Sequence, residues 1–439
     1  MAIEAAFMVP HPPLIIPQVG RGNEAEVQKT IDAYRQAAEE IAALRPDTII
    51  ISSPHSIMYH DYFHISPGSK AHGSFRDFRA PEVTFDEEYD SELVKLIEDL
   101  SRKADIPAGT MGERDSQLDH GTMVPLYFIR EKYTGGKIIR LGLSGLPLKT
   151  HYELGKIIAQ AVSQLDRHAV YVASGDLSHK LQKYGPYGYA PEGPEYDRRI
   201  MDVCSRAAFE ELFDFDDEFC AKAAECGHRS FTIMAGALDG CEVKAKQLSH
   251  EDVTGVGYGI CTFYPVGRKA ADPYVRLAKD TIESYIRKGK KIKVPDYIPD
   301  EMRDTRAGAF VSIHKNGELR GCIGTIEPTK KSVAEEIISN AVSASTRDPR
   351  FPAITEDELS SLEINVDVLS EPELINSMDE LDVKRYGVIV SSGYRRGLLL
   401  PDLEGVDSVR QQVEIAMYKG GISYDDEITL HRFEVIRHK

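Results

Sequence analysis

Tryptophan is absent from the 439-residue sequence, and cysteine is scarce. The six cysteines stand at positions 204, 220, 226, 241, 261 and 322. They form neither a CxxC pair nor a dense framework, which is typical of reduced thiols in a cytosol. No stretch approaches the roughly 20 apolar residues that span a bilayer, and Glu4 stands near the start in place of a basic patch. We therefore expect a cytoplasmic protein.

Positive charge is also in deficit. Lysine and arginine number 53 against 70 aspartates and glutamates, which leaves a formal net charge of −17. Because phosphate binding depends on clustered Lys and Arg, we expect neither a nucleic acid nor an anionic membrane as a partner. A small molecule or a protein is the expected partner. The sequence leaves the oligomeric state open, a homo-oligomer included.

The length exceeds what one hydrophobic core usually organises, so two domains are expected. In the first 265 residues, long amphipathic segments alternate with short β-branched runs. The expected helices are 24–44 and 153–167, and the expected strands are 5–9, 48–53, 138–143, 169–174 and 255–264. This alternation predicts an α/β domain with a central mixed sheet flanked by helices over residues 1–265. Proline, glycine and charged residues predict a linker over 266–273, followed by a smaller domain over 274–439.

Four histidines stand where chemistry is expected. His11, His55 and His179 each follow an expected strand, and His120 precedes an apolar run. In α/β folds the loops at the carboxyl ends of strands converge on a cleft. Imidazole is the commonest metal ligand, so these positions predict a metal or catalytic site. The alternative for each histidine alone is a surface or hydrogen-bonded residue.

Five short motifs carry a family resemblance. They are Val9-Pro10-His11-Pro12-Pro13, Ser53-Pro54-His55, Asp119-His120-Gly121, Gly175-Asp176-Leu177-Ser178-His179 and Glu225-Cys226-Gly227-His228-Arg229-Ser230. Over residues 1 to about 265 they resemble the class III extradiol ring-cleaving (LigB-like) dioxygenases and the related Memo proteins. The resemblance implies Fe(II), with zinc or another divalent metal as alternatives, held by His11, His55 and Glu225. It also implies that His179 is the acid/base and that His120 lies beside the bound oxygen.

The third ligand is left open by two adjacent residues, Glu225 and Cys226. Memo-like members have a cysteine where the dioxygenases have glutamate. Neighbouring side chains point in different directions, so we expect only one of the two to reach the metal. Glu225 is the expected ligand and Cys226 the alternative. A thiolate would favour softer metals and would argue against dioxygenase activity. If neither is a ligand, they are a helix-start glutamate and a buried cysteine.

The function implied by this resemblance is that of an Fe(II)-dependent oxidoreductase. It would be an extradiol dioxygenase that inserts both atoms of O2 into a catechol-like or phenolic substrate. The alternative from another class is a Memo-like metal-binding scaffold without dioxygenase activity, whose protein partners matter more than turnover.

The second half resembles the AMMECR-type domains, which implies a smaller α+β domain. The resemblance rests on Leu319-Arg320-Gly321-Cys322-Ile323-Gly324-Thr325, Asn340-Ala341 and Asp348-Pro349-Arg350-Phe351-Pro352. The fusion resembles the AmmeMemoRadiSam system, in which AMMECR-type, Memo-like and radical-SAM proteins are encoded together, and this implies a radical-SAM protein as a partner. This chain has no CxxxCxxC triad, so it is not that radical-SAM protein itself.

Two glycines, Gly321 and Gly324, bracket Cys322 in a strand-like run. They would let a ligand approach the backbone closely. With Arg320 and Arg350 as an anion-binding pair, the motif predicts a cleft for an anionic small molecule or an acidic partner segment. The alternative is a strand that needs glycine for packing, with Cys322 as a small buried hydrophobe.

Overall fold

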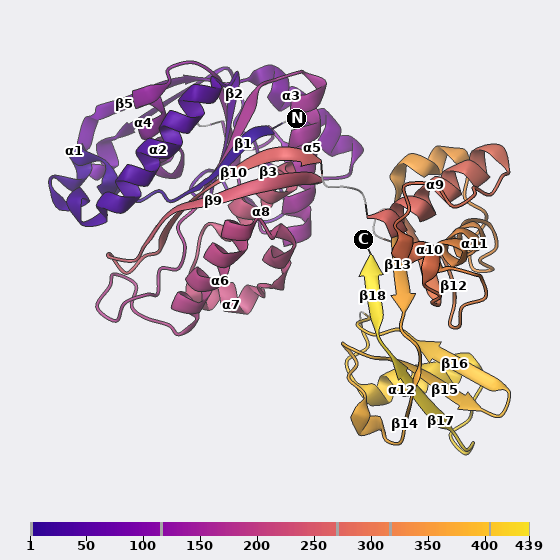
Figure 1. Cartoon of the computed structure of the whole chain (residues 1–439). Helices are drawn as coiled ribbons and strands as arrows, with labels where there is room; N and C mark the ends of the chain where they lie inside the picture. The colour runs from indigo at the N-terminus through magenta and orange to yellow at the C-terminus, as the bar shows by residue number, and fades with distance from the viewer. Residues whose placement is uncertain (1–2, 115–116, 269–271, 316–317, 404, 439) are drawn as a thin grey trace. The chain divides into compact units, whose positions relative to one another are not determined.

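The computed structural model describes residues 3–114, 117–268, 272–315, 318–403 and 405–438. The chain forms two compact units, Met1–Lys269 and Ala270–Lys439 (Figure 1). The division falls within the predicted linker, but that segment is more structured than its composition indicates. Strand β10 (Tyr258–Arg268) extends into its first part, and helix α9 (Pro273–Lys288) begins at its last residue. The middle of the predicted linker, 269–271, lies outside the described residues.

A six-stranded sheet forms the centre of the first unit, in the order β7-β2-β8-β1-β10-β9. The other strands are β1 (Ile3–Val9), β2 (Thr48–Ser53), β7 (Lys137–Gly142), β8 (Ala169–Ser174) and β9 (Cys241–Glu251). The four strands from β7 to β1 run parallel to one another, β10 pairs antiparallel with β1, and β9 pairs antiparallel with β10. This confirms the predicted mixed α/β fold. Strand β9 was not predicted, because it is an edge strand in which most residues are polar.

Helices cover both faces of this sheet (Figure 1). Helices α2 (Gln28–Leu44) and α4 (His120–Lys132) pack on one face. Helices α3 (Ser91–Lys103), α5 (Leu148–Gln164), α6 (Glu192–Arg206) and α8 (His228–Ala237) pack on the other. Successive residues of β1 point to opposite faces of the sheet, as the two-residue period of a strand requires. Phe7 packs in the core under α2 and α4, and Met8 packs in the core on the other face. The smaller elements are α1 (Pro17–Gly20), β3 (Phe63–His64), β4 (Lys70–Phe75), β5 (Ala80–Glu88), β6 (Ala108–Gly109) and α7 (Asp217–Ala223).

The second unit contains two antiparallel four-stranded sheets, ordered β12-β11-β13-β18 and β14-β17-β15-β16. Their strands are β11 (Ala309–Lys315), β12 (Glu318–Thr325), β13 (Leu362–Leu369), β14 (Glu373–Ile375), β15 (Gly387–Ser392), β16 (Arg395–Leu399), β17 (Thr429–Phe433) and β18 (Val435–His438). Helices α9, α10 (Asp300–Asp304) and α11 (Val333–Thr346) pack on the first sheet, and α12 (Val409–Gly420) on the second. This is the expected α+β arrangement. None of the helices among the described residues has both the length and the apolar character to cross a membrane.

Candidate metal centre

Three neighbouring parallel strands end at the site. Strand β1 leads to His11, β2 leads to His55, and β8, which lies between them, leads to Asp176. The two histidine Nε2 atoms are 3.0 Å apart. Together with the Cys226 sulfur they form a group whose ligand atoms all lie within 4.8 Å of one another. Among the described residues, no other group of His, Cys, Asp and Glu side chains meets this criterion.

The protonation state of His11 is set by a chain of two hydrogen bonds. The Ser174 hydroxyl donates to the Gly121 carbonyl oxygen at 2.6 Å. Its oxygen is therefore free to accept from Nδ1 of His11, which lies 3.0 Å away. A neutral His11 with its proton on Nδ1 presents the lone pair of Nε2 to the site. An outer hydrogen bond of this kind is the usual way in which proteins orient a metal-binding imidazole.

Close approach of two glycines brings Cys226 to the histidines. A Cβ atom on Gly175 would lie 2.1 Å from the Gly227 Cα, so the loop after β8 and the loop before α8 touch backbone to backbone. This contact places the Cys226 sulfur 3.7 Å from His11 Nε2 and 3.3 Å from the Asp176 backbone N–H, which donates to it. Only glycine at position 175 permits this approach.

Glu225, the expected third ligand, is not among the residues whose ligand atoms converge. Its carboxylate accepts a 2.6 Å hydrogen bond from the backbone N–H of His228, the first residue of α8. A negative charge is favourable at a helix N-terminus, where backbone N–H groups lack partners. Burial raises the pKa of Glu225 to about 7. The geometry therefore favours the alternative ligand, Cys226.

The two remaining predicted residues lie beside the group. His120, at the start of α4, has its ring centroid 3.9 Å from that of His55 and 5.5 Å from that of His11. The charge of His179 acts on both His11 and His55, and its ring lies against that of Tyr187 at 5.0 Å. His55 is itself exposed to solvent, so the group is open on one side.

Asp176 is a site residue that the sequence prediction missed. Its carboxylate accepts from the His11 backbone N–H at 2.7 Å and lies 4.0 Å from His11 Nε2. Burial raises its pKa to about 7. The sequence contained a signal for Asp176, because this residue stands inside the Gly175–His179 motif. Only the histidine of that motif was predicted to be a site residue.

The electrostatics of the group suit a cation. Burial, followed by the charges of His55, His120 and His179, lowers the pKa of His11 well below its ordinary value. Burial likewise lowers the pKa of His120 to about 4. The histidines are therefore neutral near pH 7, as metal ligands must be. Burial raises the pKa of Cys226, so the thiol ionises only when a positive ion compensates its charge.

The donor atoms fit one metal ion. Bonds of about 2.1 Å to nitrogen and 2.3 Å to sulfur separate ligand atoms on a shared ion by roughly 3 to 3.7 Å. The measured separations from His11 Nε2 are 3.0 Å to His55 and 3.7 Å to Cys226. Two imidazoles and a thiolate can bind iron, zinc or copper.

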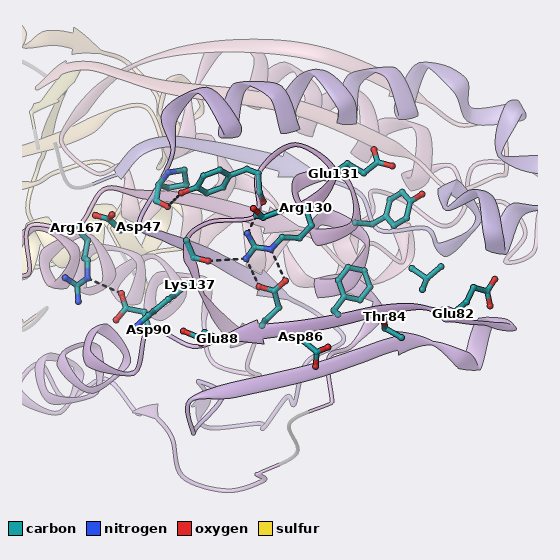
Figure 2. A pocket seen from close by; sticks show the side chains of 18 of the residues that line it. Asp47, Glu82, Thr84, Asp86, Glu88, Asp90, Arg130, Glu131, Lys137 and Arg167 are labelled. Atoms are coloured by element: carbon teal, nitrogen blue, oxygen red, sulfur yellow. Dashed lines mark hydrogen bonds and ion pairs between the residues drawn. The ribbon is translucent and has the colours of Figure 1, made fainter.

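A hollow of about 1150 Å³ in the first unit lies at the opposite end of the parallel strands from the histidines (Figure 2). Asp47, Lys137 and Arg167 line it near the amino ends of β2, β7 and β8. Its Arg130 is paired with Glu87, and Arg167 with Asp90. None of the five predicted histidine and glutamate site residues lines this hollow.

In the second unit, Arg320 and Arg350 of the predicted anion pair each have a carboxylate partner of their own. Arg320 is neutralised by Glu358 at 3.1 Å and donates to the Pro352 carbonyl, whereas Arg350 and Cys322 line a common hollow that does not include Arg320. Residues 320 and 322 both lie in β12. The register of β12 against its neighbour β11 shifts between Ile313 and His314 of β11.

The two glycines of this motif serve packing. A Cβ on Gly321 would lie 2.4 Å from the Ala344 carbonyl oxygen of α11, and one on Gly324 would lie 2.2 Å from the Phe310 ring. Both positions are thus filled by the protein's own atoms. The role of glycine here is the one given by the packing alternative.

Comparison with known proteins shows the family of the chain. A model of the catalytic LigB subunit of aromatic ring-opening dioxygenase matches residues 5–261, and an AMMECR1 model matches residues 275–438. A Clostridium acetobutylicum protein is 40% identical over 468 aligned residues, covering 100% of both chains. A Thermotoga maritima protein is 53% identical over 169 residues, 38% of this chain and 97% of that protein. The crystal structure of an uncharacterised Pyrococcus horikoshii protein, 31% identical, covers 37% of this chain and 88% of that chain with a TM-score of 0.35. The chain therefore belongs to the LigB family and carries an AMMECR1 domain after its LigB domain.

Proposed function

We propose that the first unit is a metal-dependent oxidoreductase centre. In this proposal His11, His55 and Cys226 hold one divalent metal ion, iron(II) in the active protein, and a catechol-like or phenolic substrate reacts with O2 at the open side. The convergence of the three ligand atoms within 4.8 Å carries the metal site. The LigB family membership of residues 5–261 favours reaction with O2 there, whereas the Cys226 thiol favours the second candidate function given below. When bound, iron(II) supplies electron exchange between an ortho-diol and O2, chemistry that no side chain of the chain provides.

The surrounding residues provide proton transfer and shape. Desolvation lowers the pKa of His179, so its imidazole is neutral near pH 7 and can accept a proton from a substrate hydroxyl. The same group can return the proton to the product. The rings of His120 and Phe78, whose centroids are 5.3 Å apart and whose planes are inclined by 64°, form an aromatic corner beside His55. A planar aromatic substrate can meet one ring of such a corner face to face and the other edge to face.

The test is oxygen consumption by the full-length protein. Metal-free protein is loaded with iron(II) without air and then given O2 and a panel of catechols and monophenols. We expect one O2 to disappear for each diol opened. An iron-loaded protein that leaves every diol intact would contradict ring cleavage while leaving the metal site standing.

A second candidate function is favoured by the thiol. Cys226 in place of a carboxylate suits a Memo-like metal-binding protein without ring-cleaving activity, since sulfur binds softer metals such as zinc and copper(I). Competition among iron(II), zinc and copper(I) for the metal-free protein distinguishes the two candidates. Replacing the metal by cobalt(II) gives a direct readout, because sulfur coordination produces a charge-transfer absorption that should vanish in Cys226→Ser.

A further inference from the structure

A hollow of about 490 Å³ lies in the second unit, between strands of its two sheets. One side is formed by β11, β12 and β13, and the other by β16 and α12. Figure 1 labels β12, β13, β16 and α12 in the two halves of this unit. The volume is within the range of about 300–1,000 Å³ that is usual for small-molecule sites. The metal centre lies in the other unit, so this hollow needs an explanation of its own.

The two sides of the hollow differ in chemistry. Leu398, Leu400 and Leu403 present apolar surface that the fold leaves partly exposed. Opposite them lies Cys322, whose sulfur accepts a 3.2 Å hydrogen bond from the Ser312 hydroxyl. A ligand that fills the hollow would therefore meet hydrocarbon on one side and a thiol with polar groups on the other.

Three cationic side chains line the hollow, and two of them are neutralised. Arg350 binds Asp348 through two nitrogens, and Arg437 binds Asp367 at 2.8 Å. Lys419 is different. Within the part of the chain that the structure describes, its amine has neither a hydrogen bond nor an ion pair. Lys419 is exposed and lines the hollow beside Arg350. Partial desolvation, followed by the positive charge of Arg350, lowers its pKa.

We propose that this hollow binds a small carboxylic acid with an apolar body. The carboxylate pairs with Lys419, the hydrocarbon or aromatic body covers the leucines, and the head lies beside Cys322. One uncompensated positive charge calls for one negative charge, which favours a carboxylate over a phosphate dianion. This assignment replaces Arg320 of the sequence prediction with Lys419, which stands in no motif.

Alkylation of Cys322 by two matched reagents tests the charge. Iodoacetate and iodoacetamide have nearly the same shape and both alkylate a thiolate with loss of iodide, but only iodoacetate is an anion. We expect Lys419→Gln to lower the iodoacetate-to-iodoacetamide rate ratio at Cys322 by about fivefold, the effect of one screened charge at close range. The ratio cancels any change in the thiolate fraction. Lys279→Gln, an exposed lysine on α9, is the control and should leave the ratio unchanged.

Protection of Cys322 tests the whole ligand. The full-length protein is labelled with iodoacetamide in the presence of octanoate, octanamide, acetate or inorganic phosphate, and Cys322 is followed by peptide mass spectrometry. We expect saturable protection by octanoate alone, lost in Lys419→Gln. Equal protection by octanamide would overturn the role of charge. Equal protection by acetate would overturn the role of the leucines, and equal protection by phosphate would overturn the preference for a carboxylate. An unchanged reagent ratio in Lys419→Gln would overturn the proposal itself.

Discussion

At the scale of single residues, Glu225 and Cys226 divide two tasks between them. The Glu225 carboxylate binds the backbone at the start of α8, while the Cys226 sulfur faces His11. A carboxyl partner for a helix N-terminus stabilises the fold, whereas in the proposed function the thiol among neutral imidazoles binds the metal. The two residues can therefore be separated by substitution.

We expect Cys226→Ser to lose metal and Glu225→Gln to retain it. Removing a ligand should weaken binding by more than the roughly 10- to 100-fold that changes in the outer shell cost. The glutamine keeps an oxygen acceptor for the His228 N–H, so it should mainly lower the melting temperature. Metal content is measured by mass spectrometry after dialysis, with Cys220→Ser as the thiol control. Metal loss in Glu225→Gln alone would restore glutamate as the ligand.

His179 separates binding from turnover. If it transfers protons, His179→Gln should keep its metal and lose catechol turnover by a factor on the order of 10² to 10⁴, the usual worth of a positioned acid/base. Steady-state oxygen uptake and metal content are measured on the same sample. A variant that loses its metal would make His179 a ligand instead.

At the scale of elements, the contact between the loops after β8 and before α8 assembles the site. Gly175→Ala would place a methyl group 2.1 Å from the Gly227 Cα, so the loops must separate. We expect a loss of about 1–3 kcal/mol in the free energy of unfolding, typical of overpacking, together with weakened metal binding. Gly267→Ala is the matched control, because its nearest atom is 3.7 Å away. Normal metal affinity in Gly175→Ala would show that the loop contact does not position Cys226.

Helix α5 contributes a dependence of stability on pH through His151. Its Nδ1–H donates to the Pro147 carbonyl at 3.1 Å, the Ser144 N–H points to Nε2, and burial lowers its pKa to about 4. An unfolded histidine takes up a proton below about pH 6.5. Between these pH values the unfolded chain holds more protons, so the free energy of unfolding falls as pH is lowered from 7 to 4.

Urea unfolding of the metal-free protein at several pH values measures this effect. We expect His151→Gln to make the pH dependence shallower by about one proton. His168→Gln is the control, because His168 is exposed, pairs with Glu4 at 2.6 Å and has a raised pKa, which gives the opposite slope. An unchanged slope in His151→Gln would mean that the native state accommodates the charged ring.

At the scale of the whole molecule, the two units should fold separately. Asp272 ties the start of the second unit to its end, since its carboxylate accepts from the Tyr274 and Val275 N–H groups and pairs with His438 at 2.8 Å. A fragment beginning at Asp272 should fold, and one beginning at Val275 should melt a few degrees lower after losing a cap worth about 1 kcal/mol. Residues 1–268 should bind all of the metal. Equal melting temperatures of the two C-terminal fragments would exclude the role of Asp272.

Much of the first unit could be predicted from local sequence. Buried β-branched runs define β2 and β8 within the predicted bounds, because a strand covered on both faces must be apolar throughout. His55 and His179 stand in motifs that follow β2 and β8. Parallel strands end on the same side of a sheet, so the sequence predicted that both histidines lie on that side. Strand β9 escaped prediction because an edge strand faces water.

The proposals that Cys226 rather than Glu225 binds the metal, and that Lys419 binds a carboxylate, depend only on the tertiary structure. Both adjacent side chains are chemically able to bind a metal, so composition and spacing cannot separate them. The separation comes from the contact between Gly175 and Gly227, which lie 52 positions apart, and from the N-terminus of α8. Lys419 stands in no motif and faces the hollow because α12 packs beside β16. Local sequence determines which strands and helices form, whereas the direction in which a side chain points at their junctions depends on backbone contacts between segments distant along the chain.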